Sequence, residues 1–176
     1  MTSDGDVLFR VICEQPQEDT PRLAYADWLE ENGQHERAEF IRLQCEAWGL
    51  CPQYATVQEA RERASDLLKR YGNKWYSELP FIPGVEWSSL FVRGFVDKVW
   101  LTSSKNSREA LLVAFVAAPI RYLNAPYLTP TDRRELAPLL GQLISVNGSP
   151  PIEAAPIHPA EHKWVPEGEV KSACTA

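Results

Sequence analysis

A recurring apolar pattern in the second half of the chain constrains the fold more than any other feature. Three triplets share the order apolar, two variable, apolar, one variable, then apolar or small: Val96, Val99 and Leu101; Ile120, Leu123 and Ala125; Leu143, Val146 and Gly148. They follow one another after 24 and then 23 residues, and the intervals contain helix-like stretches, 107–118 and 131–140. One short strand and one helix per unit predict neighbouring parallel strands, because a parallel pair needs a long crossover connection.

A repeat in the low twenties with this content is typical of a leucine-rich-repeat solenoid. A βαβαβ arrangement of another kind would give similar spacing, so that alternative remains open. In a solenoid the residues beside each central apolar position face the inner surface. We expect the partner-binding residues to be Lys98, Trp100, Tyr122 and Asn124, continued by Ser145 and Asn147. Exposed Trp and Tyr are the usual anchors of protein recognition. The alternative is that the N-terminal helices or the tail cover Trp100 and Tyr122.

The N-terminal part has helical periodicity instead. The pattern predicts helices over 21–32, 36–48 and 56–75, with Trp48 on the apolar side of the second. Gly33 follows the first of these helices, where a residue with left-handed backbone belongs. The first two helices therefore form a helical hairpin.

The chain thus divides into three predicted parts: a helical module (1–80), degenerate repeat-like βα units (81–148) and a proline-rich flexible tail (149–176). The predicted fold class is α+β, in which an N-terminal helical hairpin module caps a short leucine-rich-repeat-like βα solenoid with parallel strands. The tail holds five of the fourteen prolines and few large apolar residues, so it cannot build a core. Its Trp164 either folds back onto the domain or anchors another protein.

Charge is distributed unevenly along the 176 residues, whose net charge is -6. Residues 1–46 contain 11 acidic and 4 basic residues, whereas residues 47–148 contain 9 acidic and 12 basic residues. This asymmetry favours two modules that attract each other or present different surfaces to a partner. The negative total argues against a general duplex binder, so nucleic acid contact is expected only indirectly or through the basic middle segment. Without a signal-peptide pattern or a long apolar run, we expect a cytoplasmic protein that makes no membrane contact.

The segment EDTPRLAYADWLEENGQHERAEFIRLQC, residues 18–45, resembles the core motif of the bacterial repeat-companion domain. This family is expanded in planctomycetes and often occurs beside leucine-rich repeats. The matching residues are Asp19, Pro21, Arg22, Leu23, Tyr25, Ala26, Asp27, Trp28, Leu29, Glu30, Gly33, Ala38, Glu39, Phe40, Ile41, Arg42, Leu43 and Gln44. The later FVRGFVDKVWL and APIRYLNAPYL look like the region leading into the repeats of such proteins, although this chain has only about three degenerate units. No catalytic activity is established for the family, so the resemblance implies an interaction module without naming its partner.

A dense acidic group within the resembling segment has two interpretations. Its members are Asp27, Glu30, Glu31, Glu36 and Glu39. Such carboxylates suit a divalent ion or a general acid/base pair, yet arginines accompany them in the sequence. A carboxylate beside arginine more often ties two helices together, so we expect structural ion pairs made by Arg22, Asp27 and Arg42.

The other candidates for chemistry are weaker. His158 and His162 match the inverted zinc-peptidase pattern, but the adjacent Pro159 and the missing third ligand argue against a zinc site. The four cysteines are too irregularly spaced for a disulfide framework and are expected to be reduced and mostly buried. Because phosphate-loop, nucleophile-elbow and kinase motifs do not occur, we expect no enzyme activity, no metal and no cofactor.

These observations favour a non-catalytic adaptor or accessory subunit of a bacterial cytoplasmic complex, which docks another protein. The alternative is an accessory subunit of a nucleoprotein complex, for instance in bacterial defence, that contacts nucleic acid or its effector enzyme. Salt dependence distinguishes the two, since contacts to several phosphates weaken steeply as salt rises.

Overall fold

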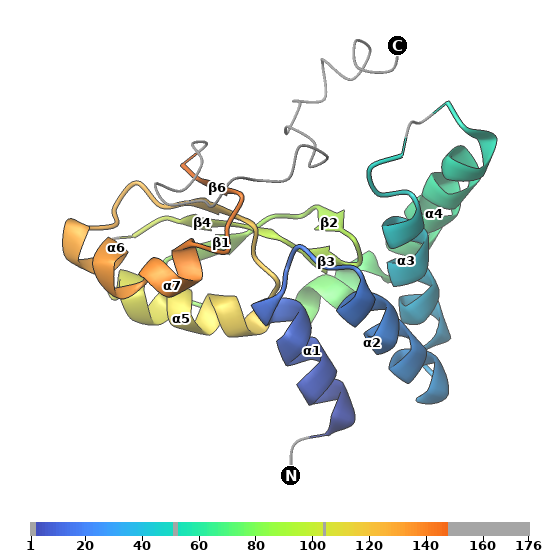
Figure 1. Ribbon diagram of the computed structural model, residues 1–176, viewed down its shortest axis with the longest axis horizontal. Coiled ribbons are helices and arrows are strands. Elements are labelled where there is room, and N and C mark those ends of the chain that lie inside the picture. The colour runs from blue at the N-terminus through green and yellow to red at the C-terminus, as the bar shows by residue number, and fades with distance from the viewer. Residues whose placement is uncertain (1–2, 51–52, 104, 148–176) are drawn as a thin grey trace.

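The computed structural model describes residues 3–50, 53–103 and 105–147, which form a mixed α+β fold (Figure 1). Four helices come first: α1 (Asp4–Glu14), α2 (Thr20–Glu31), α3 (His35–Glu46) and α4 (Ala55–Ser77). Strands and helices follow: β1 (Val85–Trp87), β2 (Phe91–Val92), β3 (Phe95–Val96), β4 (Lys98–Leu101), α5 (Ser107–Ala117), β5 (Tyr122–Asn124), α6 (Pro130–Glu135), α7 (Ala137–Leu140) and β6 (Ser145–Val146). The predicted tail 149–176, with Trp164, and the repeat residue Gly148 lie outside the described residues.

The helices begin and end close to the residues that the sequence predicts. The backbone of Gly33 after α2 has a φ of 74°, the left-handed conformation expected at the end of a helix. The helix predicted over 131–140 is instead divided into α6 and α7. Pro138 explains the division, because it has no N–H to donate to the preceding turn and restricts the backbone before it.

β4, β5 and β6 are parallel neighbours in one sheet, in the order that the repeat predicts. Val99 pairs with Leu123, and Leu123 pairs with Val146, so the central apolar residues of the three units form one row across the sheet. Two features differ from the prediction. β1 joins β4 in antiparallel orientation, which makes the sheet mixed, and Val96 belongs to β3, which pairs with β2 in a separate two-stranded sheet.

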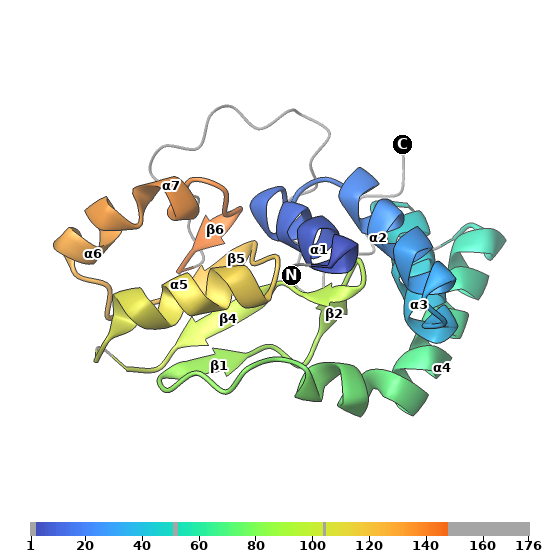
Figure 2. The ribbon, with the colours of Figure 1, turned by 90° about the horizontal axis from the view of Figure 1, so that it is seen from below.

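Helices α5, α6 and α7 lie along one face of the four-stranded sheet, and the described helices leave the opposite face open (Figures 1 and 2). The core between these helices and the sheet is apolar. It includes Val99, Leu101, Leu111, Ala114, Phe115, Leu123, Leu136, Leu140 and Val146. Burial of this surface is the main force that holds the strands and helices of this part together.

The β2–β3 hairpin inserts into the helical part of the molecule. Phe95 of β3 packs in the cluster that contains Ile12 and Ile41, whereas Phe91 of β2 packs against the Phe40 and Trp75 cluster. Through the hairpin, the second predicted module therefore contributes side chains to the apolar clusters of the first.

Side chains of the helical part also bind the hairpin backbone. The turn between β2 and β3 has positive φ at Arg93 (48°) and at Gly94 (91°). Gly94 N–H donates to Gln44 Oε1 at 2.8 Å, and Gln44 Nε2 donates to the Phe91 carbonyl at 3.1 Å. The Gln44 side-chain amide of α3 thus makes the hydrogen bonds to these two backbone groups that a neighbouring strand would otherwise make.

We expect Gly94→Ala to lower the free energy of unfolding by about 2–4 kcal/mol, because it adds backbone strain to overpacking. A Cβ at position 94 would lie 2.5 Å from Ile41 Cγ1 and 3.2 Å from Ile41 Cα. Gly33→Ala is the matched control, since φ there is also positive but no atom lies within 4 Å of the new Cβ. It should cost only about 1 kcal/mol. Urea denaturation measures both, and equal losses would show that the approach of the turn to α3 is not tight.

Candidate protein interface on the open face of the sheet

Four residues predicted to bind a partner lie together on the face of the sheet opposite α5. Lys98 is beside Tyr122 in the parallel pairing of β4 and β5, and Trp100 is beside Asn124. Their neighbours along the strands, such as Val99 and Leu123, point into the core. Lys98, Trp100 and Tyr122 are half-buried and Asn124 is exposed, so the set, called here the strip, is accessible.

The strip is extended at both edges. Ser145 pairs with Tyr122 across β5 and β6, and Glu86 pairs with Trp100 across β1 and β4. Within the strip, Lys98 Nζ lies 4.9 Å from the centre of a Trp100 ring, at the distance of a cation–π contact. The strip therefore offers large aromatic surfaces beside charged and amide groups, as protein-binding surfaces do.

Trp48 continues this surface from the helical part, which the sequence did not predict. The Arg121 guanidinium lies 4.7 Å from the Trp48 ring centre and 5.5 Å from that of Tyr122. Trp48 is 43% exposed and follows the end of α3. The predicted helix ran through residue 48, where a Trp on the apolar side would be buried. The earlier helix end is what brings this ring to the surface.

A buried ion pair lies beside the strip. Arg121 Nε and Nη2 donate to Asp97 Oδ2 at 2.9 and 2.6 Å, and both side chains are almost fully buried. The Asp97 carbonyl also accepts from the N–H groups of Arg121 and Tyr122. Since Asp97 precedes β4 and Arg121 precedes β5, the pair fixes the offset between these strands and hence the position of Tyr122 beside Lys98.

The residues predicted to make structural ion pairs separate into two places. Arg42 bridges α2 and α3, with Nη2 at 2.8 Å from Asp27 Oδ1 and Nη1 at 2.9 Å from Glu30 Oε2. Hydrogen bonds from Arg42 and His35 lower the pKa of Glu30. Arg22 lies elsewhere, fully buried, where Nη2 donates to the Pro16 carbonyl at 2.8 Å. The nearest carboxylate to its Nε is that of Asp19, at 4.0 Å.

Four of the five acidic residues that suited a metal or an acid/base pair make other contacts. Besides the Arg42 pairs, Glu39 forms an ion pair with Arg63 and Glu36 accepts a hydrogen bond from the Tyr71 hydroxyl. Among residues 3–50, 53–103 and 105–147, no three His, Cys, Asp or Glu side chains come together as a metal site. The predicted zinc pattern at His158 and His162 lies outside these residues.

Two cysteines are described, and both are poor nucleophiles. Burial raises the pKa of the Cys13 thiol to about 12, and burial together with Asp19 raises that of Cys45 to about 12. At neutral pH both are thiols rather than the thiolates that react. The described residues therefore offer no activated cysteine.

Comparisons with protein-family models, with curated proteins and with solved structures found no match. In the described part of the chain, no helix has the length and apolar character that crossing a bilayer requires. The functional assignment therefore depends on the residues and geometry above.

We expect Asp97→Asn to lower the free energy of unfolding by about 3–5 kcal/mol, because it leaves the buried Arg121 charge without its partner. Asp27→Asn is the control, since it removes the same charge from the pair with Arg42, where the Asp27 side chain is 70% exposed. That exposed pair should contribute less than about 1 kcal/mol. Urea denaturation at constant salt compares the two, and a small loss for Asp97→Asn would contradict its role in fixing the strands.

A second prediction concerns the thiols. In a variant carrying Cys51→Ser and Cys174→Ser, Cys13 and Cys45 should react with a disulfide reagent at pH 8 on the order of 100-fold more slowly than in urea. The raised pKa values favour the folded state below about pH 9, and this contribution is lost as pH rises toward 12. If Cys13 and Cys45 of the native protein react as fast as the thiol of free glutathione, they are not shielded.

Proposed function

We propose that this chain is a non-catalytic protein-interaction module, an adaptor or accessory subunit that docks another protein on the open face of its sheet. The observation that carries the proposal is the alignment of Trp100 and Tyr122 with Lys98 and Asn124 on one accessible face. Aromatic rings with polar neighbours supply most of the binding energy in typical interfaces. Trp48 enlarges the same surface from the helical side.

The proposal extends to the fold and to the family of this chain. We infer that β4, β5 and β6 with their helices are degenerate leucine-rich-repeat-like units capped by a bacterial repeat-companion module. Support comes from the parallel register of Val99, Leu123 and Val146 at the repeat interval. A cytoplasmic setting is part of the proposal, and the free thiols of Cys13 and Cys45 agree with a reducing compartment.

Docking of a protein is favoured over contact with nucleic acid. Two arginines of the basic middle segment, Arg93 and Arg121, are only 3% and 2% exposed and are engaged with Asp19 and Asp97. Buried guanidinium groups do not reach phosphates, so the positive charge of the segment overstates its surface charge. A nucleoprotein partner is therefore the alternative outcome of the test.

We expect Trp100→Ala and Tyr122→Ala each to weaken partner binding by about 10-fold or more, as hot-spot truncations do. The measurement is quantitative co-purification from the native organism followed by affinity measurement with the purified partner. Tyr54→Ala is the matched control, because Tyr54 is 57% exposed and caps the start of α4. That end of α4 lies far from the sheet (Figures 1 and 2). Its binding should equal that of the unaltered chain.

The same complex is measured at 50 and 200 mM salt. A protein partner held by aromatic contacts should lose little affinity, whereas binding through several phosphates should fall by orders of magnitude. Unchanged binding by both strip variants, with thermal melting showing that they fold, would overturn the proposed interface.

A further inference from the structure

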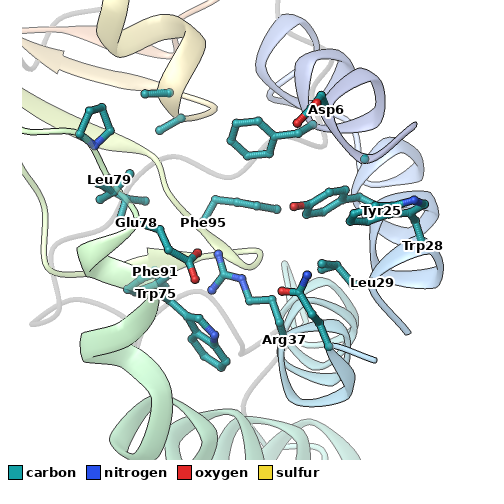
Figure 3. Close-up of a pocket in the computed structure, with 17 residues that line it drawn as sticks. Asp6, Tyr25, Trp28, Leu29, Arg37, Trp75, Glu78, Leu79, Phe91 and Phe95 are labelled. Carbon is teal, nitrogen blue, oxygen red and sulfur yellow. The ribbon is translucent and has the colours of Figure 1, made fainter. Parts of the chain in front are cut away.

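A pocket of about 400 Å³ lies where the helical part meets the β2–β3 hairpin and the end of α5. Figure 3 shows its walls, which come from elements distant in the sequence: Tyr25 and Trp28 of α2, Arg37 of α3, Trp75 of α4, and Phe95 of β3. The volume is in the range of small-molecule sites, which favour such junctions between parts of a fold. The pocket is separate from the strip and plays no part in the proposed docking.

Arg37 is the distinctive polar group of this pocket. Its guanidinium carbon lies 4.7 Å from the Trp75 ring centre, and 5.4 and 5.3 Å from those of Phe91 and Phe95. Nη1 is buried and has no hydrogen-bond acceptor among the described residues. Burial lowers the pKa of Arg37 to about 10, so the group remains positively charged at neutral pH. A buried, charged donor without an acceptor requires an explanation, and a bound anion supplies one.

Two carboxylates stand near the pocket and limit what that anion can be. Asp6 is engaged in the α1 cap, where it accepts from the Ser3 N–H. Glu78 is exposed, and Figure 3 shows its carboxylate directed toward Arg37. No ion pair joins Glu78 to Arg37 among the described side chains, although the negative charge acts on the arginine. Since these two carboxylates outnumber the single Arg37 charge, a second negative charge on the ligand, as on a dianionic phosphate, would add more repulsion than attraction.

The Tyr25 hydroxyl adds a second donor. Figure 3 shows it directed toward Phe95, into the same pocket that the Arg37 guanidinium enters. Burial raises the pKa of Tyr25, so the hydroxyl stays protonated and able to donate. The Arg37 guanidinium and the Tyr25 hydroxyl can both donate hydrogen bonds to the two oxygens of a carboxylate. The surrounding rings can pack against an apolar body attached to that carboxylate.

We propose that this pocket binds a small monocarboxylate with an aromatic or branched apolar body, its carboxylate on Arg37 and Tyr25 and its body against apolar side chains of the pocket wall such as Phe95 and Leu79. Glu78 opposes this binding through its charge. Removal of that charge should therefore tighten the site, whereas removal of the Arg37 charge should abolish it.

The test is isothermal titration calorimetry of the full chain with 3-phenylpropionate, which should bind saturably. The neutral analogue 3-phenylpropanol should bind at least ~10-fold more weakly, because it lacks the charge that Arg37 recognises. Inorganic phosphate should not compete. Absence of saturable binding by 3-phenylpropionate, or equal binding of the alcohol, would overturn the proposal.

Variants separate the roles of the charges. Arg37→Gln should lose binding, and Glu78→Gln should strengthen it by about 3-fold or more as a repulsive charge is removed. Glu59→Gln is the matched control, because Glu59 is an exposed carboxylate of α4 that does not line the pocket, and it should leave the affinity unchanged. If Arg37→Gln fails to fold, the exposed Glu78 still decides: weaker or unchanged binding by Glu78→Gln would contradict the site.

Discussion

The contact on which the remaining structure depends is that between the Arg93 side chain and the loop joining α1 to α2. Arg93 Nη1 donates to the Gln17 carbonyl and to Asp19, and Nη2 donates to the Pro16 carbonyl. Arg22 donates to the same Pro16 carbonyl. Two buried guanidinium groups repel each other, and burial together with Arg93 and Arg121 lowers the pKa of Arg22 to about 10. Such an arrangement persists only because the backbone carbonyls and Asp19 compensate the charges.

This contact explains how the helical part and the sheet are held together. The turn that carries Arg93 also places Gly94 against Ile41 and sends Phe91 and Phe95 into the helical clusters. Because the hairpin leads directly into β4, the orientation of the sheet follows from its anchoring. The pocket around Arg37 exists for the same reason, since its walls come from both sides of this junction.

Periodic features of the fold were predictable from the sequence, and features made by single long-range contacts were not. The row Val99, Leu123 and Val146 follows from spacing alone, because strand residues of successive units must face one core. The same alternation places Trp100 and Tyr122 on the opposite face. By contrast, the two-residue strands β2 and β3 carry no period, and their pairing depends on the Gln44 amide, 47 residues from Phe91. We expected Arg22 to contact Asp27 because the two are close in the sequence. In the structure Arg22 is buried and donates to the Pro16 carbonyl instead.

Segmental charge illustrates why composition describes a surface poorly. The acidic and basic segments do attract each other, through Asp19 with Arg93 and Glu39 with Arg63. Charges that are paired in this way are no longer available to a partner molecule. Arg93 and Arg121 are buried by their contacts, and what they leave at the surface is the Trp48 ring, which covers both guanidinium groups at 5.1 and 4.7 Å. The segment 47–148, which is basic in composition, therefore presents an aromatic surface around Trp48. Such a surface suits recognition of a protein better than recognition of phosphates.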